Sequence, residues 1–120
     1  MDKKQEVVKY LVEVKGFMER ERGTLISLTE FASISGIPFK TILPMFDPDH
    51  PRLPSEKNAE KIAKLTGSNR INEIMGYPII DPTYLSVMRI YPQLKPDQQQ
   101  ALLRYIRGMT DDKKMEVVTA

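Results

Sequence analysis

The segment that decides the fold is LTEFASISGIPFKTILPM, residues 28–45. Ser27 directly precedes it and forms a capping box with Glu30, in which the serine hydroxyl accepts from the glutamate N–H and the carboxylate reaches back to the serine N–H. Phe31 belongs to the apolar face of the short helix that follows. Gly36 then supplies the positive φ that a tight turn needs. The first half of the segment therefore predicts a capped helix and a turn.

The second half of the segment predicts another helix that packs across the first. Pro38 fits the first position of this helix, where its missing N–H costs nothing. Ile42 and Met45 place apolar side chains on one face, and the small Ala32 allows the two helices to approach closely. Two short helices joined by such a turn have the spacing of a helix-turn-helix.

Apolar residues recur at helical spacing through most of the remaining chain. The proline-rich stretch 47–54 is an exception and predicts a loop. No segment predicts a strand, so the expected fold class is all-α, with a charged tail over residues 110–120 whose end frays. The further helices are expected over residues 3–22, 56–66 and 70–75, from Pro82 or Thr83 to the residues before Pro92, and over residues 96–109.

The composition excludes several classes of protein. The chain has 120 residues, no cysteine and one histidine. Disulfides, a thiol nucleophile, a thiolate zinc site and a histidine metal cluster are therefore excluded. The sequence contains no phosphate-binding loop, glycine-rich dinucleotide turn or H-E-x-x-H motif. We expect neither an enzyme nor a protein that carries a metal or cofactor.

The net charge and hydropathy set limits on the partners. A net charge of +2 is too small for binding to phosphate by bulk charge alone. We find neither the apolar region of a signal peptide nor the roughly 20 apolar residues that span a bilayer. The expected location is the cytoplasm, without a membrane partner.

The order and spacing of several short motifs, over about residues 17–77, resemble the XRE family of lambda-repressor-like helix-turn-helix transcription regulators. The motifs are Glu19-Arg20-Glu21-Arg22-Gly23, Leu28-Thr29-Glu30-Phe31-Ala32, Gly36-Ile37, Pro54-Ser55, Ile62-Ala63 and Ile74-Met75-Gly76-Tyr77. The resemblance implies a five-helix DNA-binding bundle over residues 1–77. Residues 78–120 resemble the two-helix C-terminal extension of some members, which serves packing or dimerisation.

The resemblance also implies a function, namely sequence-specific operator binding to double-stranded DNA as a homodimer. Residues 38–46 would be the recognition helix. Lys40 and Thr41, with Phe39 beside them, would approach the bases. The residues implied to hold the DNA backbone are Thr29, His50 and Arg52.

The recognition helix leaves a second interpretation open. Base edges are read chiefly by polar side chains, and among the outward positions Lys40 is the main reader. Pro44 removes a hydrogen bond to the carbonyl of Lys40 and kinks a regular helix. Residues 23–54 carry two basic and three acidic side chains, a net charge of −1. The alternative is therefore a protein-interaction adapter that binds its partner through Phe39, Leu43 and Pro44, unless the helix tilts or breaks and buries these side chains.

Overall fold

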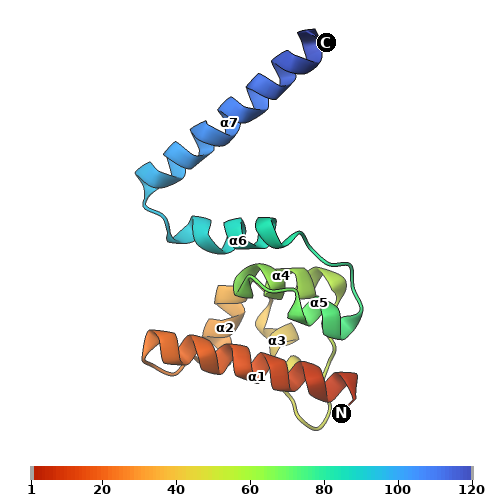
Figure 1. The fold of residues 1–120 in the computed structure, drawn as a ribbon. Coiled ribbons are helices and arrows are strands. Elements are labelled where there is room, and N and C mark those ends of the chain that lie inside the picture. Colours follow the sequence, from red (N-terminus) through yellow and green to blue (C-terminus); the bar gives the residue numbers. More distant parts are fainter. Residues whose placement is uncertain (1, 120) are drawn as a thin grey trace. The chain divides into compact units, whose positions relative to one another are not determined.

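The computed structural model describes residues 2–119, and the side chains of residues 2–109. Within these residues the chain forms seven α-helices and one 3-10 turn, with no strand, so the expected all-α class is confirmed (Figure 1). The helices are α1 (Lys3–Arg22), α2 (Leu28–Ser35), α3 (Phe39–Met45), α4 (Glu56–Thr66), α5 (Arg70–Met75), α6 (Pro82–Ile90) and α7 (Pro96–Thr119), and the 3-10 turn is Tyr91–Gln93.

The chain divides into two compact units. The first extends to Arg89 and the second begins at Ile90. The domain boundary predicted from the sequence puts α6 in the C-terminal extension, which begins at residue 78. In the structure α6 lies in the first unit, because Leu85 on this helix is buried in the core of that unit. The prolines within residues 76–82 predict a linker between helices. They do not predict which unit the next helix packs against.

The core of the first unit takes side chains from each of its helices. The buried faces predicted from helical spacing are confirmed for most residues, since Phe31 of α2, Ile42 and Met45 of α3, Ile62 of α4 and Ile71 of α5 are inaccessible. Three residues expected to point inward, Leu65, Ile74 and Met75, are only partly buried, and Ile34 of α2 is 44% exposed. The largest buried side chains of the core are Val7, Leu11, Phe31, Ile37, Ile42, Met45, Ile62, Ile71 and Leu85. Packing of α2 against both α3 and α4, and of α5 against both α1 and α4, closes this core.

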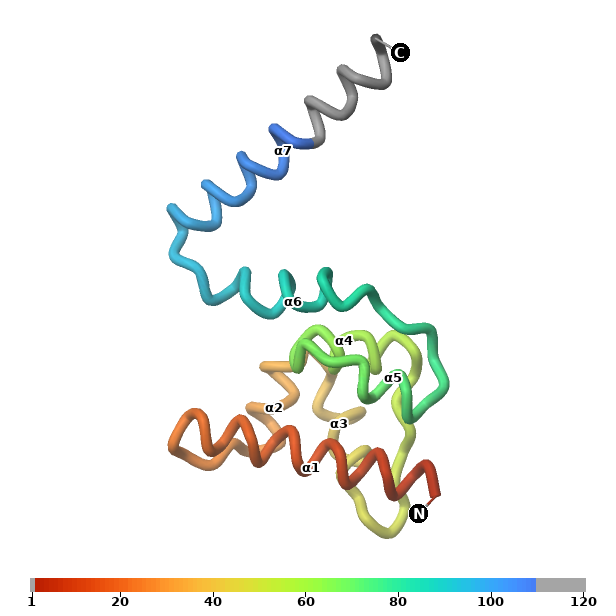
Figure 2. Tube along the Cα trace, in the orientation of Figure 1, coloured from red at the N-terminus to blue at the C-terminus, as the bar shows by residue number. Residues whose placement is uncertain are grey.

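Local sequence signals place most helix ends. Asp2 caps α1 by accepting from the N–H of Gln5 at 2.9 Å, and Ser55 caps α4 in the same way by accepting from the N–H of Asn58 at 3.2 Å. Gly23 adopts the left-handed conformation, with φ 81°, at the end of α1. Figure 2 traces the long loop that joins α3 to α4 and bears no regular structure.

Three helix boundaries differ from those predicted. Helix α3 ends at Met45, and Phe46, predicted as its last residue, caps it with φ −98° and ψ 0°. Pro38 lies one position before the first helical residue of α3, where its ψ of 143° is extended, rather than inside the helix. Helix α7 does not end near Met109 but continues to Thr119. The sequence of these additional residues is mostly charged and polar, which is why it predicts a tail. The predicted fraying concerns the end of this stretch, of which Ala120 lies outside the described residues.

Candidate nucleic-acid interface

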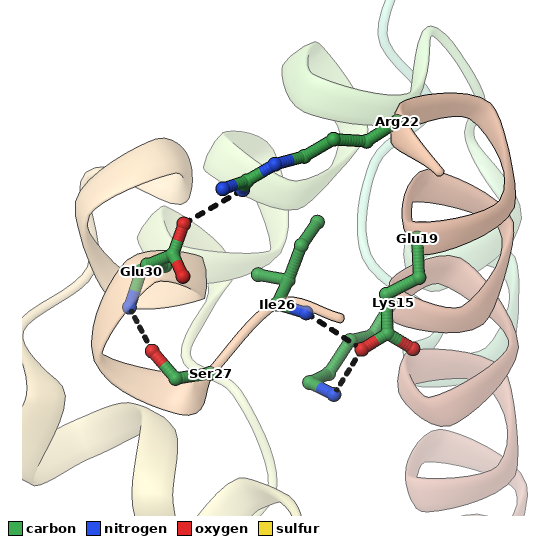
Figure 3. A network of polar contacts seen from close by, with 6 residues as sticks. All are labelled: Lys15, Glu19, Arg22, Ile26, Ser27 and Glu30. Carbon is green, nitrogen blue, oxygen red and sulfur yellow. Dashed lines mark hydrogen bonds and ion pairs between the residues drawn. The ribbon is translucent and has the colours of Figure 1, made fainter. Parts of the chain in front are cut away.

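The end of α1 is bonded to the chain that leads into α2 (Figure 3). The Glu19 carboxylate accepts from the N–H of Ile26 at 2.8 Å and from the ammonium of Lys15 at 2.9 Å. Arg22 donates to the carboxylate of Glu30 at 2.6 Å, which joins the last turn of α1 to the first turn of α2. These contacts set where α2 begins relative to α1.

Both glutamates of this network have a lowered pKa. The N–H of Ile26, followed by Lys15, stabilises the carboxylate of Glu19 and lowers its pKa. The pKa of Glu30 is lowered mainly by the hydrogen bond from Arg22. One bond of the predicted capping box is present, because Ser27 accepts from the N–H of Glu30 at 3.1 Å. The Glu30 carboxylate accepts from Arg22, and the N–H of Ser27 also lowers its pKa.

The turn between α2 and α3 is held by hydrogen bonds that sequence reasoning missed. Gly36 has φ 74°, and its N–H donates to the carbonyl of Ala32 at 2.9 Å. The buried Ser35 hydroxyl donates to the same carbonyl at 3.2 Å and accepts from the N–H of Ile37 at 3.3 Å. Lys61 of α4 donates to the carbonyl of Gly36 at 2.9 Å. The sequence contains no local signal for this last bond, because the two residues are 25 positions apart.

Helix α3 has one buried and one exposed face. Ile42 and Met45 are inaccessible, whereas Phe39 is 43% and Leu43 50% exposed. Lys40 is exposed on the outer side. The predicted outward position of Phe39, Lys40 and Leu43 is thus confirmed, and α3 does not turn Phe39 and Leu43 inward.

Pro44 ends α3 rather than kinking a longer helix, since the helix has one further residue. Its side chain is half-buried. The carbonyl of Pro44 accepts from the N–H of Arg52 at 3.0 Å. This bond holds the loop against the end of α3. Phe46, directly after the helix, meets the ring of Phe31 edge-on at 5.4 Å between centroids, which fixes this end of α3 against α2.

The loop after α3 is a set of local turns. The Asp47 carboxylate accepts from the N–H of Asp49 at 2.9 Å and of His50 at 3.3 Å, and these two bonds lower the pKa of Asp47. Farther along, the Tyr77 hydroxyl donates to the carbonyl of the buried Pro54 at 2.8 Å and anchors the end of the loop to the unit. The described residues contain no cluster of three His, Cys, Asp or Glu side chains that could hold a metal ion.

The structure brings some of the predicted site residues together. Phe39, Lys40 and Thr41 lie on consecutive positions of α3, although Thr41 is half-buried between the two faces. Arg52 lies at the opposite end of α3, where its N–H donates to the carbonyl of Pro44. His50 is exposed in the same loop, and Thr29 is exposed in the first turn of α2. Among the described residues, the side chains of Lys40, His50 and Arg52 are in no ion pair within 4.0 Å.

Comparison with family models, curated proteins and solved structures finds no match to this chain. Among the described residues, no helix has the length and apolar character that crossing a membrane requires.

Proposed function

We propose that this protein is a helix-turn-helix transcriptional regulator of the lambda-repressor-like XRE type, which binds double-stranded operator DNA through α2 and α3. The observation that carries the proposal is the two-sided character of α3. Its inner face is buried at Ile42 and Met45, and its outer face presents Lys40 to solvent directly after the glycine turn. A recognition helix needs this arrangement, because it must be held rigidly from behind while its N-terminal residues enter the major groove.

The proposed contacts follow from the elements that carry them. Lys40 and Thr41 approach base edges from the first turns of α3, with Phe39 beside them. Thr29, at the start of α2, meets a phosphate with its hydroxyl and with the free N–H groups of that helix end. His50 and Arg52 hold the DNA backbone beyond the far end of α3. Two copies of the chain place two such helices on an operator with two half-sites.

The charged side chains around α3 can accommodate a DNA phosphate, because two of the acidic ones have partners within the protein and the basic ones have no acidic partner in the part of the chain that the structure describes. Residues 23–54 have a net charge of −1, but Glu30 is neutralised by Arg22, which lies outside that range. Two backbone N–H groups are directed at the Asp47 carboxylate. Lys40 and Arg52, in contrast, have no acidic partner among the described residues. Their positive charge therefore remains available to DNA phosphates.

The test is a titration of fluorescent genomic DNA fragments from the source organism, followed by anisotropy at about 50 mM and 200 mM salt. We expect binding that weakens steeply with salt. Lys40→Ala should reduce the affinity about tenfold, in the range for loss of one specific base contact. Lys9→Ala removes the same charge from the exposed side of α1 and should bind as the unchanged protein does. Equal losses in both variants would show that only net charge matters.

The exposed apolar residues of α3 favour one rival function, an adapter that binds a protein partner. Phe39 and Leu43 offer a hydrophobic anchor, with the half-buried Pro44 beside them. The same titration separates the two functions. Absence of binding at low salt, where non-specific phosphate contacts are strongest, would reject the DNA-binding proposal and leave the adapter.

A further inference from the structure

The outer face of α3 carries a pair of apolar side chains that the proposed function leaves unexplained. Phe39 and Leu43 are four residues apart, so they lie on the same side of the helix. At a rise of about 1.5 Å per residue they are about 6 Å apart along the helix axis. Phe39 also borders a shallow hollow between α2 and α3, lined in part by Ala32 and Ser33. The pair therefore faces outward as one apolar surface, and we call it the α3 apolar pair.

An apolar pair on a recognition helix has one apolar target on the base edges of the major groove. In the major groove the bases present one apolar group, the 5-methyl group of thymine. Apolar side chains of DNA-binding proteins contact this group. Successive bases of one strand are about 3.4 Å apart. A separation of about 6 Å along α3 therefore corresponds to thymines about two base steps apart when the helix follows the groove.

The charges beside the pair favour DNA over an apolar protein surface. Lys40 lies between Phe39 and Leu43 in sequence and is exposed without an ion partner among the described residues. Arg52 is bonded through its N–H to the carbonyl of Pro44, directly after Leu43. A cation thus accompanies the pair near each end of α3. This arrangement complements a groove whose floor carries methyl groups and whose walls carry phosphates.

We propose that α3 reads thymine: Phe39 and Leu43 pack on the 5-methyl groups of thymines in the major groove, and Lys40 and Arg52 bind the flanking acceptors and phosphates. The chain would therefore select operators rich in A·T pairs. This inference rests on the proposed DNA-binding function and adds the sequence class that the interface recognises.

Deoxyuridine provides the test, because it pairs as thymine does but lacks the 5-methyl group. The probes are three labelled duplexes of equal length: alternating dA and dT, alternating dA and dU, and alternating dG and dC. Alternation presents a pyrimidine at every second position of each strand, so every register offers methyl groups in the first duplex only. The full chain is titrated by anisotropy at low salt. We expect binding to the dT duplex about tenfold tighter than to the dU duplex, the change that loss of two buried methyl contacts produces.

A pair of variants assigns the preference to these side chains. The double variant Phe39→Ala, Leu43→Ala should bind the dT and dU duplexes equally. Both residues are exposed, so thermal unfolding of this variant should match that of the unchanged protein. Val12→Ala truncates an exposed apolar residue of α1 and should leave the tenfold preference intact.

The possible outcomes separate the proposal of thymine reading from the underlying proposal of DNA binding. Equal binding of the unchanged protein to dT and dU duplexes, still weakened by salt, would overturn thymine reading and leave the DNA-binding function standing. A preference for dT that persists in the double variant would also overturn it, since the preference would then arise from DNA shape or from other residues. Absence of binding to all three duplexes would overturn both proposals and assign the apolar pair to a protein partner.

Discussion

Two neighbouring residues of α3 provide a matched test of which face of this helix packs against the core. Ile42 is inaccessible to solvent, whereas Leu43 is half exposed. Both are replaced by alanine in separate variants. The two substitutions remove the same number of carbon atoms from the same helix, so a difference in stability reports which face of α3 is buried.

The expected cost of Ile42→Ala follows from its burial. The substitution removes three carbon atoms from a fully buried side chain, a transfer free energy of about 2.4 kcal/mol at about 0.8 kcal/mol per methylene. The cavity that remains raises the total to about 3–4 kcal/mol, within the range for such core truncations. For a domain of this size each kcal/mol lowers the Tm by about 4–8 °C, so a Tm decrease of about 12 °C or more is expected. Leu43→Ala should change the stability by about 0.5 kcal/mol or less.

Urea unfolding followed by circular dichroism measures both costs, and calorimetry supplies the Tm. Ile42→Val, expected to cost about 1 kcal/mol, replaces Ile42→Ala if the larger truncation prevents folding. A loss at Leu43 equal to or larger than that at Ile42 would refute the reasoning, because it would mean that α3 is rotated and packs its apolar outer residues inside. Such a rotation would also remove the surface on which the DNA-binding proposal depends.

Two further predictions concern the glycine caps and the network of α1 and α2. Gly67 and Gly76 both have positive φ, at 69° and 74°, so alanine at either position should cost about 1–2 kcal/mol in urea unfolding. Gly67→Ala should cost more, because its Cβ would lie 2.9 Å from the Cδ of Arg89, whereas the space at Gly76 is open; equal costs would refute the close approach of α6 to the end of α4. The lowered pKa values of Glu19 and Glu30 mean that their ionised forms stabilise the fold at pH values above the ordinary glutamate pKa. This contribution is lost as the pH falls through the lowered pKa values of the folded state. Stability measured against pH should therefore decrease over this acidic range, and the decrease should be smaller in the double variant Glu19→Gln, Glu30→Gln; an unchanged profile would contradict the assignment.

Local signals were sufficient for most of the secondary structure. Ser27 placed the start of α2 and Gly36 its end, and helical spacing gave the ranges of α1, α4 and α5. The end of α7 was missed because the charged sequence of residues 110–119 was interpreted as a tail rather than as a continuation of the helix. Pro38 was misplaced by one position, since a proline suits both the first helical residue and the extended residue before it.

The candidate site was likewise predicted in part: local features were found from the sequence, and contacts between distant residues were missed. Helical spacing identified which side of α3 would face inward, because Ile42 and Met45 recur at three residues and any helix with this pattern buries that face. It could not find Lys61 at the turn or the return of Arg52 to the end of α3, because these bonds join residues 25 and 8 positions apart. Contacts between residues so far apart in the sequence form only when tertiary packing brings their segments together, so local sequence patterns do not predict them.

The sequence by itself determined that this protein is helical, where its caps and turns lie, and which face of each helix is apolar, because these properties depend on residues within one or two turns of one another. Only the tertiary structure decided that α6 joins the first unit through Leu85 and that Glu30 is neutralised by Arg22. It also decided that Lys40 and Arg52 have no acidic partner within 4.0 Å among the described residues. Burial and charge pairing are set by which helices meet, and that depends on packing in three dimensions.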